Sequence, residues 1–234
     1  MIVAAWAITL LLALDGPARA LDRFEIQVYD GTANAPGQPS VELHANGVVS
    51  GADEGHLTLE PAFGVTRFWE AGAYLLTAIT ADGQYEFAGA KLRSKLVAPD
   101  APLRLGCNFE VSYVRPPFDI ERWGAEVRPI VGWDGPRWGI WANPIVDVSF
   151  SGAPSLEPAA MALVKVAGVA SLGLEYYGDF GPVNHLGAGQ QYLFEVANLL
   201  AMRNLELNAG VGEGLTAASN ALVIKLIFGY AYQR

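Results

Sequence analysis

The sequence has a single cysteine, Cys107, among its 234 residues, so it cannot form an intrachain disulfide. Cys107 also lies too far from the start of the chain to be the acylated N-terminal cysteine of a lipoprotein. No cluster of Lys and Arg is present, and the formal net charge of −9 argues against nucleic acid as a partner. We interpret Cys107 as a small apolar residue that faces lipid.

Charged residues are scarce as well. They make up 17% of the chain, whereas a typical soluble domain has about 25%. Hydrophobic residues reach 52%, yet after residue 20 no apolar run approaches the length of about 18 residues that predicts a transmembrane helix. High hydrophobicity without long apolar runs is typical of strands that alternate lipid-facing and polar side chains.

We interpret residues 1–20 as a secretory signal peptide that precedes a single barrel domain over 21–234. Met1 to Leu14 are almost entirely apolar, and Ala18-Arg19-Ala20 has the small-x-small pattern of a cleavage site. No Lys or Arg precedes the apolar run, so an uncleaved membrane anchor is the alternative. The run is shorter than the ~20 residues that a helix needs to span a bilayer, which favours cleavage.

Alternation of apolar and polar side chains is clearest in the last segment, 221–232. Its even positions are apolar and end in Tyr230 and Tyr232, whereas Lys225 lies at an odd position. Successive side chains of a strand point to opposite faces, so one face of this segment is apolar and the other carries a charge. The same period recurs along most of the chain, between clusters of Gly, Pro, Asp and Asn that predict turns.

This pattern predicts an all-β fold, a closed antiparallel transmembrane β-barrel of about 12 strands, with about 10 to 14 as the range. We expect strands at 40–50, 55–63, 67–79, 84–96, 103–115, 121–133, 137–150, 157–166, 168–178, 189–199, 203–212 and 220–232. Most of them have the ~9–11 residues that cross a bilayer at a tilt. An even number of strands returns both ends of the barrel to one side.

Two segments leave the strand assignment open. Residues 157–170 are rich in Ala and also have the propensity for a helix. Residues 24–30 alternate and would make a thirteenth strand. We interpret them instead as part of a short N-terminal segment, 21–39, that lies in the periplasm or in the lumen.

A soluble barrel or sandwich, with its apolar face inward, is the alternative architecture. The scarcity of charge disfavours it, because a soluble core needs a polar exterior. Aromatic residues also gather at predicted strand ends, where Tyr and Trp favour the lipid headgroup region. The predicted aromatic girdle consists of Trp123, Trp133, Trp138, Trp141, Tyr230 and Tyr232.

If the apolar faces contact lipid, strand parity assigns the opposite faces to the lumen. The candidate lumen and selectivity residues are Glu42, His44, Glu70, Lys91, Arg93, Lys95, Arg104, Glu110, Glu126, Arg128, Asp147, Glu206 and Lys225. The same parity adds Glu60, Glu175, Glu195 and Lys165. Charges in a low-dielectric barrel must be paired or hydrated. The cations of 91–95 would therefore attract anionic solutes or be neutralised by Glu70 and Glu110, and we favour neutralisation.

We expect an outer-membrane channel or uptake protein that lets a small solute pass through this charge-lined lumen. The alternative is a non-conducting structural or adhesive barrel, whose lumen is filled by a salt-bridged plug. The expected partners are outer-membrane lipids, the outer-membrane assembly machinery and the solute. The expected location is the bacterial outer membrane, after export that depends on the signal peptide.

The sequence predicts no catalytic residues, no metal ligands and no cofactor. A lipid hydrolase needs a nucleophilic Ser, a base and an orienting group on the outer surface. None of His44, His56 and His185 pairs with a Ser at strand spacing, and His and Cys do not cluster as metal ligands do. A lipid-modifying enzyme is therefore the least favoured class.

Several short stretches carry a resemblance to known proteins. They are Leu57-Thr-Leu-Glu-Pro61 with Gly64-Val-Thr66, Gly89-Ala-Lys-Leu-Arg93, Glu126-Val-Arg-Pro-Ile130, Ala142-Asn-Pro-Ile145, Leu174-Glu-Tyr-Tyr-Gly178 and Gly210-Val-Gly-Glu-Gly-Leu-Thr216. The chain resembles a family of small Gram-negative outer-membrane β-barrel proteins of uncharacterised function. It is similar, more distantly, to predicted barrel proteins encoded near aromatic-degradation pathways. The resemblance implies a location and an architecture, and it carries over no substrate or catalytic residues.

Overall fold

The computed structural model describes residues 21–49, 54–98, 102–119, 122–150, 152–202 and 204–232. Among these residues, no helix is long and apolar enough to cross a membrane. The predicted signal peptide, 1–20, lies outside the described residues.

The described residues form fourteen strand segments. They are β1 (Pro39–Val48), β2 (Gly55–Thr66), β3 (Trp69–Ile79), β4 (Tyr85–Val97), β5 (Leu103–Val114), β6 (Trp123–Asp134), β7 (Trp138–Asn143), β8 (Val146–Ser149), β9 (Ser155–Leu156), β10 (Ala159–Ala167), β11 (Ala170–Gly178), β12 (Gln191–Met202), β13 (Leu205–Gly214) and β14 (Leu222–Ala231).

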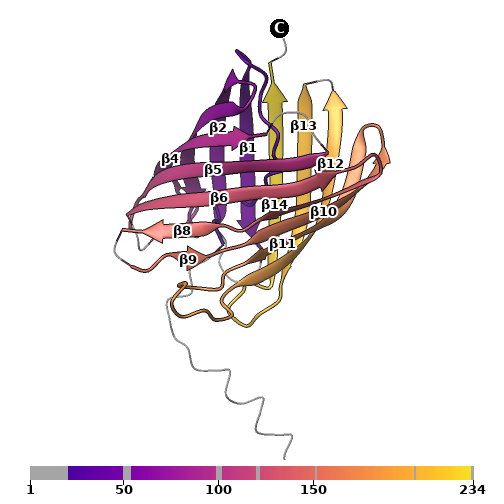
Figure 1. The fold of residues 1–234 in the computed structure, drawn as a ribbon. Coiled ribbons are helices and arrows are strands. Elements are labelled where there is room, and N and C mark those ends of the chain that lie inside the picture. The colour runs from indigo at the N-terminus through magenta and orange to yellow at the C-terminus, as the bar shows by residue number, and fades with distance from the viewer. Residues whose placement is uncertain are drawn as a thin grey trace, which may run out of the picture.

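One antiparallel sheet closes on itself into a barrel (Figure 1), because β1 pairs with β14 and β5 pairs with β6. β7 and β8 both pair with β6, so they form one barrel strand that is interrupted at Pro144. β9 and β10 continue each other in the same way, pairing with β8 and β7. The fourteen segments thus make twelve barrel strands, as predicted. The helical alternative for residues 157–170 is wrong, because β10 is a strand.

The two ends of the barrel differ in the length of their connections. Connections 49–54, 80–84, 115–122, 150–154, 179–190 and 215–221 lie at one end, which we name the long-loop end. Connections 67–68, 98–102, 135–137, 168–169 and 203–204 lie at the other, the short-turn end. β1 begins and β14 ends at the short-turn end, which is uppermost in Figure 1. Outer-membrane barrels have short periplasmic turns and longer extracellular loops, so in such a barrel the short-turn end would face the periplasm.

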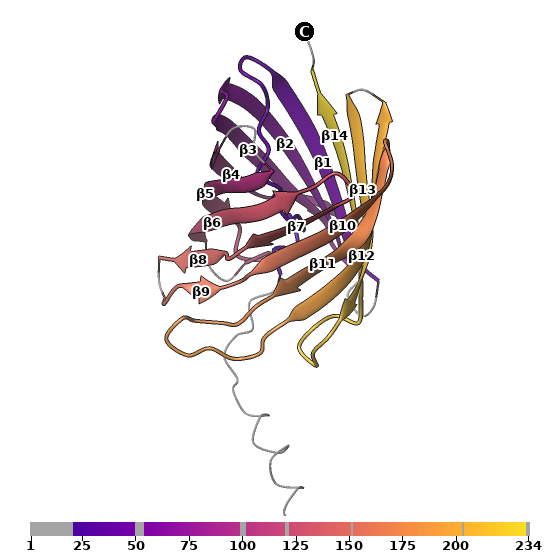
Figure 2. The same cartoon turned by 45° about the vertical axis from the view of Figure 1, so that its right-hand side comes forward.

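The wall has an apolar outer face and a more polar inner face. In β14, Ile224 and Phe228 are exposed, whereas Lys225 and Ile227 are buried. The apolar even face of this strand therefore points outward, as the sequence predicts. Figure 2 shows how the strands from β5 to β11 curve in front of β1, β13 and β14, so that the inner faces enclose a lumen.

The predicted aromatic girdle is wrong at one position. The residues on or near the outer surface are Trp123, Trp133, Trp138, Tyr230 and Tyr232. Trp141 faces inward instead and is only 5% exposed, compared with 53% for Trp138. The two residues are three positions apart in one strand, so alternation must send them to opposite faces.

The expectation that Glu195 faces the lumen is also wrong. In β12 the buried inner residues are Tyr192, Phe194 and Val196, and Glu195 between them is exposed on the outer face. It lies in a groove of about 720 Å³ whose lining includes the outward-facing Ala197. The outer wall thus carries a carboxylate in the fifth of the twelve residues of β12.

Replacing Glu195 with leucine is expected to stabilise the barrel in a lipid bilayer. A carboxylate on the lipid face costs less than the ~2–4 kcal/mol of Arg or Lys at the midplane, so we expect a gain of about 1–2 kcal/mol. The measurement is urea unfolding in lipid vesicles. Glu213→Leu is the matched control, since Glu213 also faces outward but lies next to the end of β13. A control effect as large as that of Glu195→Leu would contradict the prediction.

Candidate functional site

Residues 21–38 run through the lumen from one end of the barrel to the other. At the long-loop end, Arg23 Nη1 lies 3.1 Å from Glu54 Oε2. At the short-turn end, Asn34 Nδ2 donates a hydrogen bond of 2.6 Å to Ser40 Oγ at the start of β1. We name this stretch the lumen segment.

Side chains of the wall, rather than a neighbouring strand, bind the main chain of the lumen segment. Tyr29 N donates to Asn143 Oδ1 (2.7 Å), and Asn143 Nδ2 donates back to Tyr29 O (3.1 Å). Three further donors reach main-chain carbonyls: Asn46 Nδ2 to Arg23 O (2.9 Å), Lys225 Nζ to Ile26 O (3.1 Å) and Arg128 Nη1 to Gln27 O (3.3 Å). Buried backbone groups need such partners. This explains how residues 24–30 alternate like a strand without joining the sheet.

Glu25 is the buried carboxylate of the lumen segment that binds the wall, beside the part-exposed Asp22, which also pairs with Lys91. Its Oε1 lies 3.2 Å from Arg128 Nη1, and its Oε2 lies 3.4 Å from Lys91 Nζ. The Tyr29 and Tyr74 hydroxyls donate to Oε1 at 2.8 and 3.2 Å. Glu25 and these four partners are all buried. A carboxylate with two cations and two hydroxyl donors is well compensated for its loss of hydration.

The same cations also pair with carboxylates of the wall. Lys91 Nζ lies 3.0 Å from Glu110 Oε2, and Arg128 Nε lies 2.7 Å from Glu126 Oε1. Glu110 and Glu126 are direct cross-strand partners in β5 and β6. The two cations therefore also offset the charge repulsion between these neighbouring carboxylates.

A second cluster lies nearer the short-turn end. Arg93 Nη2 lies 2.6 Å from Glu60 Oε1 and 2.7 Å from Glu70 Oε1, and Lys95 Nζ lies 2.9 Å from Glu70 Oε1. Asn34 N of the lumen segment donates to Glu70 Oε2 at 2.6 Å. The three cations of residues 91–95 are thus paired with carboxylates, which is the neutralised arrangement that the sequence favours.

The remaining predicted lumen residues are spread around the inner wall. Lys225 contacts Glu175, and both side chains are buried. Arg104 and Lys165 both pair with Asp134, at 3.2 and 2.6 Å. Asp147 is the register partner of Glu126 and so shares its inner face. Glu42, His44 and Glu206 lie on the inner faces of β1 and β13.

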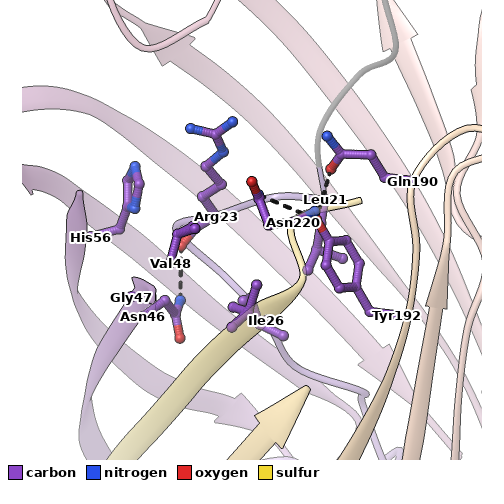
Figure 3. Close-up of a pocket in the computed structure, with 11 residues that line it drawn as sticks. Leu21, Arg23, Ile26, Asn46, Gly47, Val48, His56, Gln190, Tyr192 and Asn220 are labelled. Atoms are coloured by element: carbon purple, nitrogen blue, oxygen red, sulfur yellow. Dashed lines mark hydrogen bonds between the residues drawn. The ribbon is translucent and has the colours of Figure 1, made fainter. Parts of the chain in front are cut away.

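The lumen is almost closed at the long-loop end. Leu21, Arg23 and Ile26 lie there between the ends of β1 and β2 on one side and Tyr192 and Asn220 on the other (Figure 3). The cavity among these residues measures only about 10 Å³. A neighbouring cavity beside Glu25 measures about 30 Å³. These two cavities have room for one to a few water molecules, so neither admits a larger solute.

The short-turn half of the lumen remains open as a vestibule of about 620 Å³. Six carboxylates and three cations line it, namely Asp30, Glu42, Glu60, Asp134, Glu175 and Glu206 with Arg93, Lys95 and Lys165. Arg104 and Lys225 behind the lining neutralise part of this excess. A cavity with more acidic than basic groups concentrates cations and repels anions.

The fold is similar to that of solved outer-membrane proteins. The COG4313 outer-membrane channel of Pseudomonas putida F1 aligns with a TM-score of 0.59 and 11% identity, over 89% of this chain and all of that chain. The KdgM porin aligns with a TM-score of 0.61 and 8% identity, over 83% of this chain and 99% of its own. Omp33 of Acinetobacter baumannii aligns with a TM-score of 0.53 and 7% identity, over 86% and 100%.

This is the fold of a bacterial outer-membrane β-barrel. No family model matches the chain, and no curated protein sequence matches it. The apolar outer face agrees with the fold, and together they place the barrel in the outer membrane. Two of the solved structures that it resembles are an outer-membrane channel and a porin.

The sequence alone did not indicate the residues that hold the lumen segment. Asn46 and Asn143 are uncharged, so they did not stand out among the charged candidates. Glu25 and Tyr29 lie before the first barrel strand, in a stretch with no predicted role. The alternation of residues 24–30 was the available signal, because an extended segment of that kind needs hydrogen-bond partners.

Proposed function

We propose that the protein is a gated outer-membrane channel whose lumen segment closes the extracellular half of the pore. The observation that carries this proposal is the contrast between the two halves of the lumen. Cavities of about 10 and 30 Å³ at the long-loop end face a vestibule of about 620 Å³ at the short-turn end. Displacement of residues 21–32 would join the vestibule to the outside.

The vestibule supports passage of small cationic or neutral polar solutes. Its lining has six carboxylates and three cations, and with Arg104 and Lys225 behind the lining one carboxylate remains in excess. A KdgM porin was solved in complex with disordered oligogalacturonate, which is a polyanion. The acidic vestibule of this chain disfavours such a substrate, since like charges repel in a confined space.

Planar-bilayer conductance of residues 21–234 and of a variant that lacks residues 21–32 tests the proposal. We expect the chain with its lumen segment to be mostly closed. We expect the deletion variant to show a steady, larger and cation-selective conductance. Glu206→Gln in the deletion background should lower the cation selectivity, because Glu206 lines the vestibule. Glu213→Gln, on the outer face of the same strand, is the matched control. A deletion variant that inserts but never conducts would contradict the proposal and favour a non-conducting structural barrel.

A further inference from the structure

Two neighbouring strands bring an imidazole and two carboxylates to one spot on the inner wall. Glu42 and His44 are two positions apart in β1, and Glu60 of β2 is the register partner of Glu42. All three side chains therefore share the inner face, with His44 diagonal to Glu60. His44 is fully buried and Glu60 almost so, whereas Glu42 reaches the vestibule with 32% of its side chain exposed.

The spacing of the three donor atoms suits a tetrahedral metal ion. His44 Nε2 lies 3.1 Å from Glu60 Oε2 and 3.5 Å from Glu42 Oε2. One ligand atom from each residue lies within 4.8 Å of the others. Tetrahedral Zn²⁺ with bonds of about 2.0–2.2 Å separates its ligand atoms by about 3.3 Å. The two distances from the imidazole straddle that value, and a small rotation of the part-exposed Glu42 adjusts the third.

Neighbouring groups orient the two carboxylates as the outer shell of a metal site does. Arg93 Nη2 binds Glu60 through Oε1 at 2.6 Å, which leaves Oε2 directed at His44. Gln27 Nε2 of the lumen segment donates to Glu42 Oε2 at 3.2 Å. Such outer contacts usually hold metal ligands in a fixed orientation.

Two buried polar groups at the cluster lack hydrogen-bond partners among the described residues. His44 Nδ1 has no hydrogen-bond partner among the described residues, so the carboxylates are the groups that fix the imidazole. Thr58, which is fully buried and lies opposite His44 in register, has a hydroxyl without a partner in the same part of the chain. Both carboxylates line the vestibule, so a coordination position would open to solvent there.

The charge balance around the cluster also favours a divalent cation. Glu206 approaches Glu42 across Gly229: a Cβ built on this glycine would lie 3.6 Å from Glu42 Cγ and 3.7 Å from Glu206 Cβ. The nearby cations, Arg93 and Lys95, are shared with Glu70. A double positive charge beside Glu42 and Glu60 would relieve this accumulation of carboxylates.

We propose that Glu42, His44 and Glu60 bind one divalent transition-metal ion of the Zn²⁺ type, with its fourth position open to the vestibule. One imidazole and two carboxylates match the preference of Zn²⁺ and related ions, whereas Ca²⁺ and Mg²⁺ take only oxygen ligands. The sequence did not indicate this site, because Glu60 joins the other two residues only through the register of β1 and β2. The site does not depend on whether the barrel conducts.

Titration of the folded chain, residues 21–234 in detergent, with Co²⁺ tests this site by visible absorption, and Zn²⁺ serves as the competitor. We expect one equivalent of Co²⁺ to give a tetrahedral spectrum that one equivalent of Zn²⁺ abolishes. His44→Gln and Glu42→Gln should each remove the spectrum, and Gln27→Ala should weaken binding by roughly 10-fold. Glu42→Gln covers the case in which His44→Gln fails to fold, since Glu42 is part-exposed. The change in gel mobility on heating reports whether each variant is folded.

His185→Gln is the control for adventitious binding, because His185 lies in an exposed connection. This variant should keep the full spectrum and stoichiometry. Folded wild-type protein that gives no stoichiometric spectrum would overturn the proposal. So would a spectrum that persists in both His44→Gln and Glu42→Gln. The cluster would then be an imidazolium bridge between two carboxylates, with a purely structural role.

Discussion

Lys225→Met is expected to destabilise the barrel by about 3–5 kcal/mol, the cost of leaving a buried carboxylate without its cation. Lys225 of β14 and Glu175 of β11 contact each other inside the barrel, and their side chains are 0% and 2% exposed. Tyr177 also donates to Glu175, but a hydroxyl cannot neutralise its charge. The measurement is the free energy of unfolding in urea, in lipid vesicles.

The double variant Lys225→Met/Glu175→Leu should recover most of this loss, since replacing a buried ion pair with apolar residues is often close to neutral. Lys165→Met is the matched control, because Lys165 pairs with Asp134 but is 42% exposed. It should cost at most about 1 kcal/mol. If the two single lysine variants lowered the free energy of unfolding equally, burial of the Lys225 pair would not determine how much that pair stabilises the barrel.

Glu25→Gln is expected to weaken the attachment of the lumen segment by about 1.5–3 kcal/mol, the range for hydrogen bonds to charged groups. The amide keeps the shape of the side chain but removes the charge that Lys91 and Arg128 share. Limited proteolysis should then cleave residues 21–38 faster, and the conductance should show more frequent openings.

Glu54→Gln is the control for the Glu25 variant. It also breaks an ion pair between the lumen segment and the barrel, but both partners, Arg23 and Glu54, are more than a third exposed. An exposed pair contributes at most about 1 kcal/mol, so proteolysis and conductance should stay close to wild type. Faster cleavage in Glu54→Gln than in Glu25→Gln would contradict the view that the buried cluster holds the segment.

The barrel could be predicted from the sequence because each barrel strand repeats the same two-residue period. Lys225 and its apolar neighbours are assigned to the correct faces by that period alone. The assigned faces are wrong at two places, once where aromatic residues are grouped by composition and once where the inner face of a strand is apolar. Trp141 was grouped with Trp138 as an aromatic residue at a strand start, although the two cannot share a face. Strand parity assigns Glu195 to the lumen because its face carries the charge, but in β12 the apolar Phe194 and Val196 beside it occupy the inner face.

The contents of the lumen depend on contacts that a single sequence does not display. The pairing of Glu42 with Glu60 follows from the register of β1 and β2, and the turn between them leaves several registers open. The binding of Tyr29 by Asn143 joins residues 114 positions apart. Such long-range polar contacts have no local periodicity, so they emerge only from the closed barrel.

Because of the lumen segment, the two ends of the described chain lie on opposite sides of the membrane. Leu21 lies at the long-loop end, whereas Tyr232 lies beside Pro39 at the short-turn end. The twelve barrel strands and the segment together make thirteen crossings, which is an odd number. With the predicted signal peptide, 1–20, removed, we expect a peptide tag fused before Leu21 to be displayed on the cell surface and one fused after Tyr232 to remain in the periplasm.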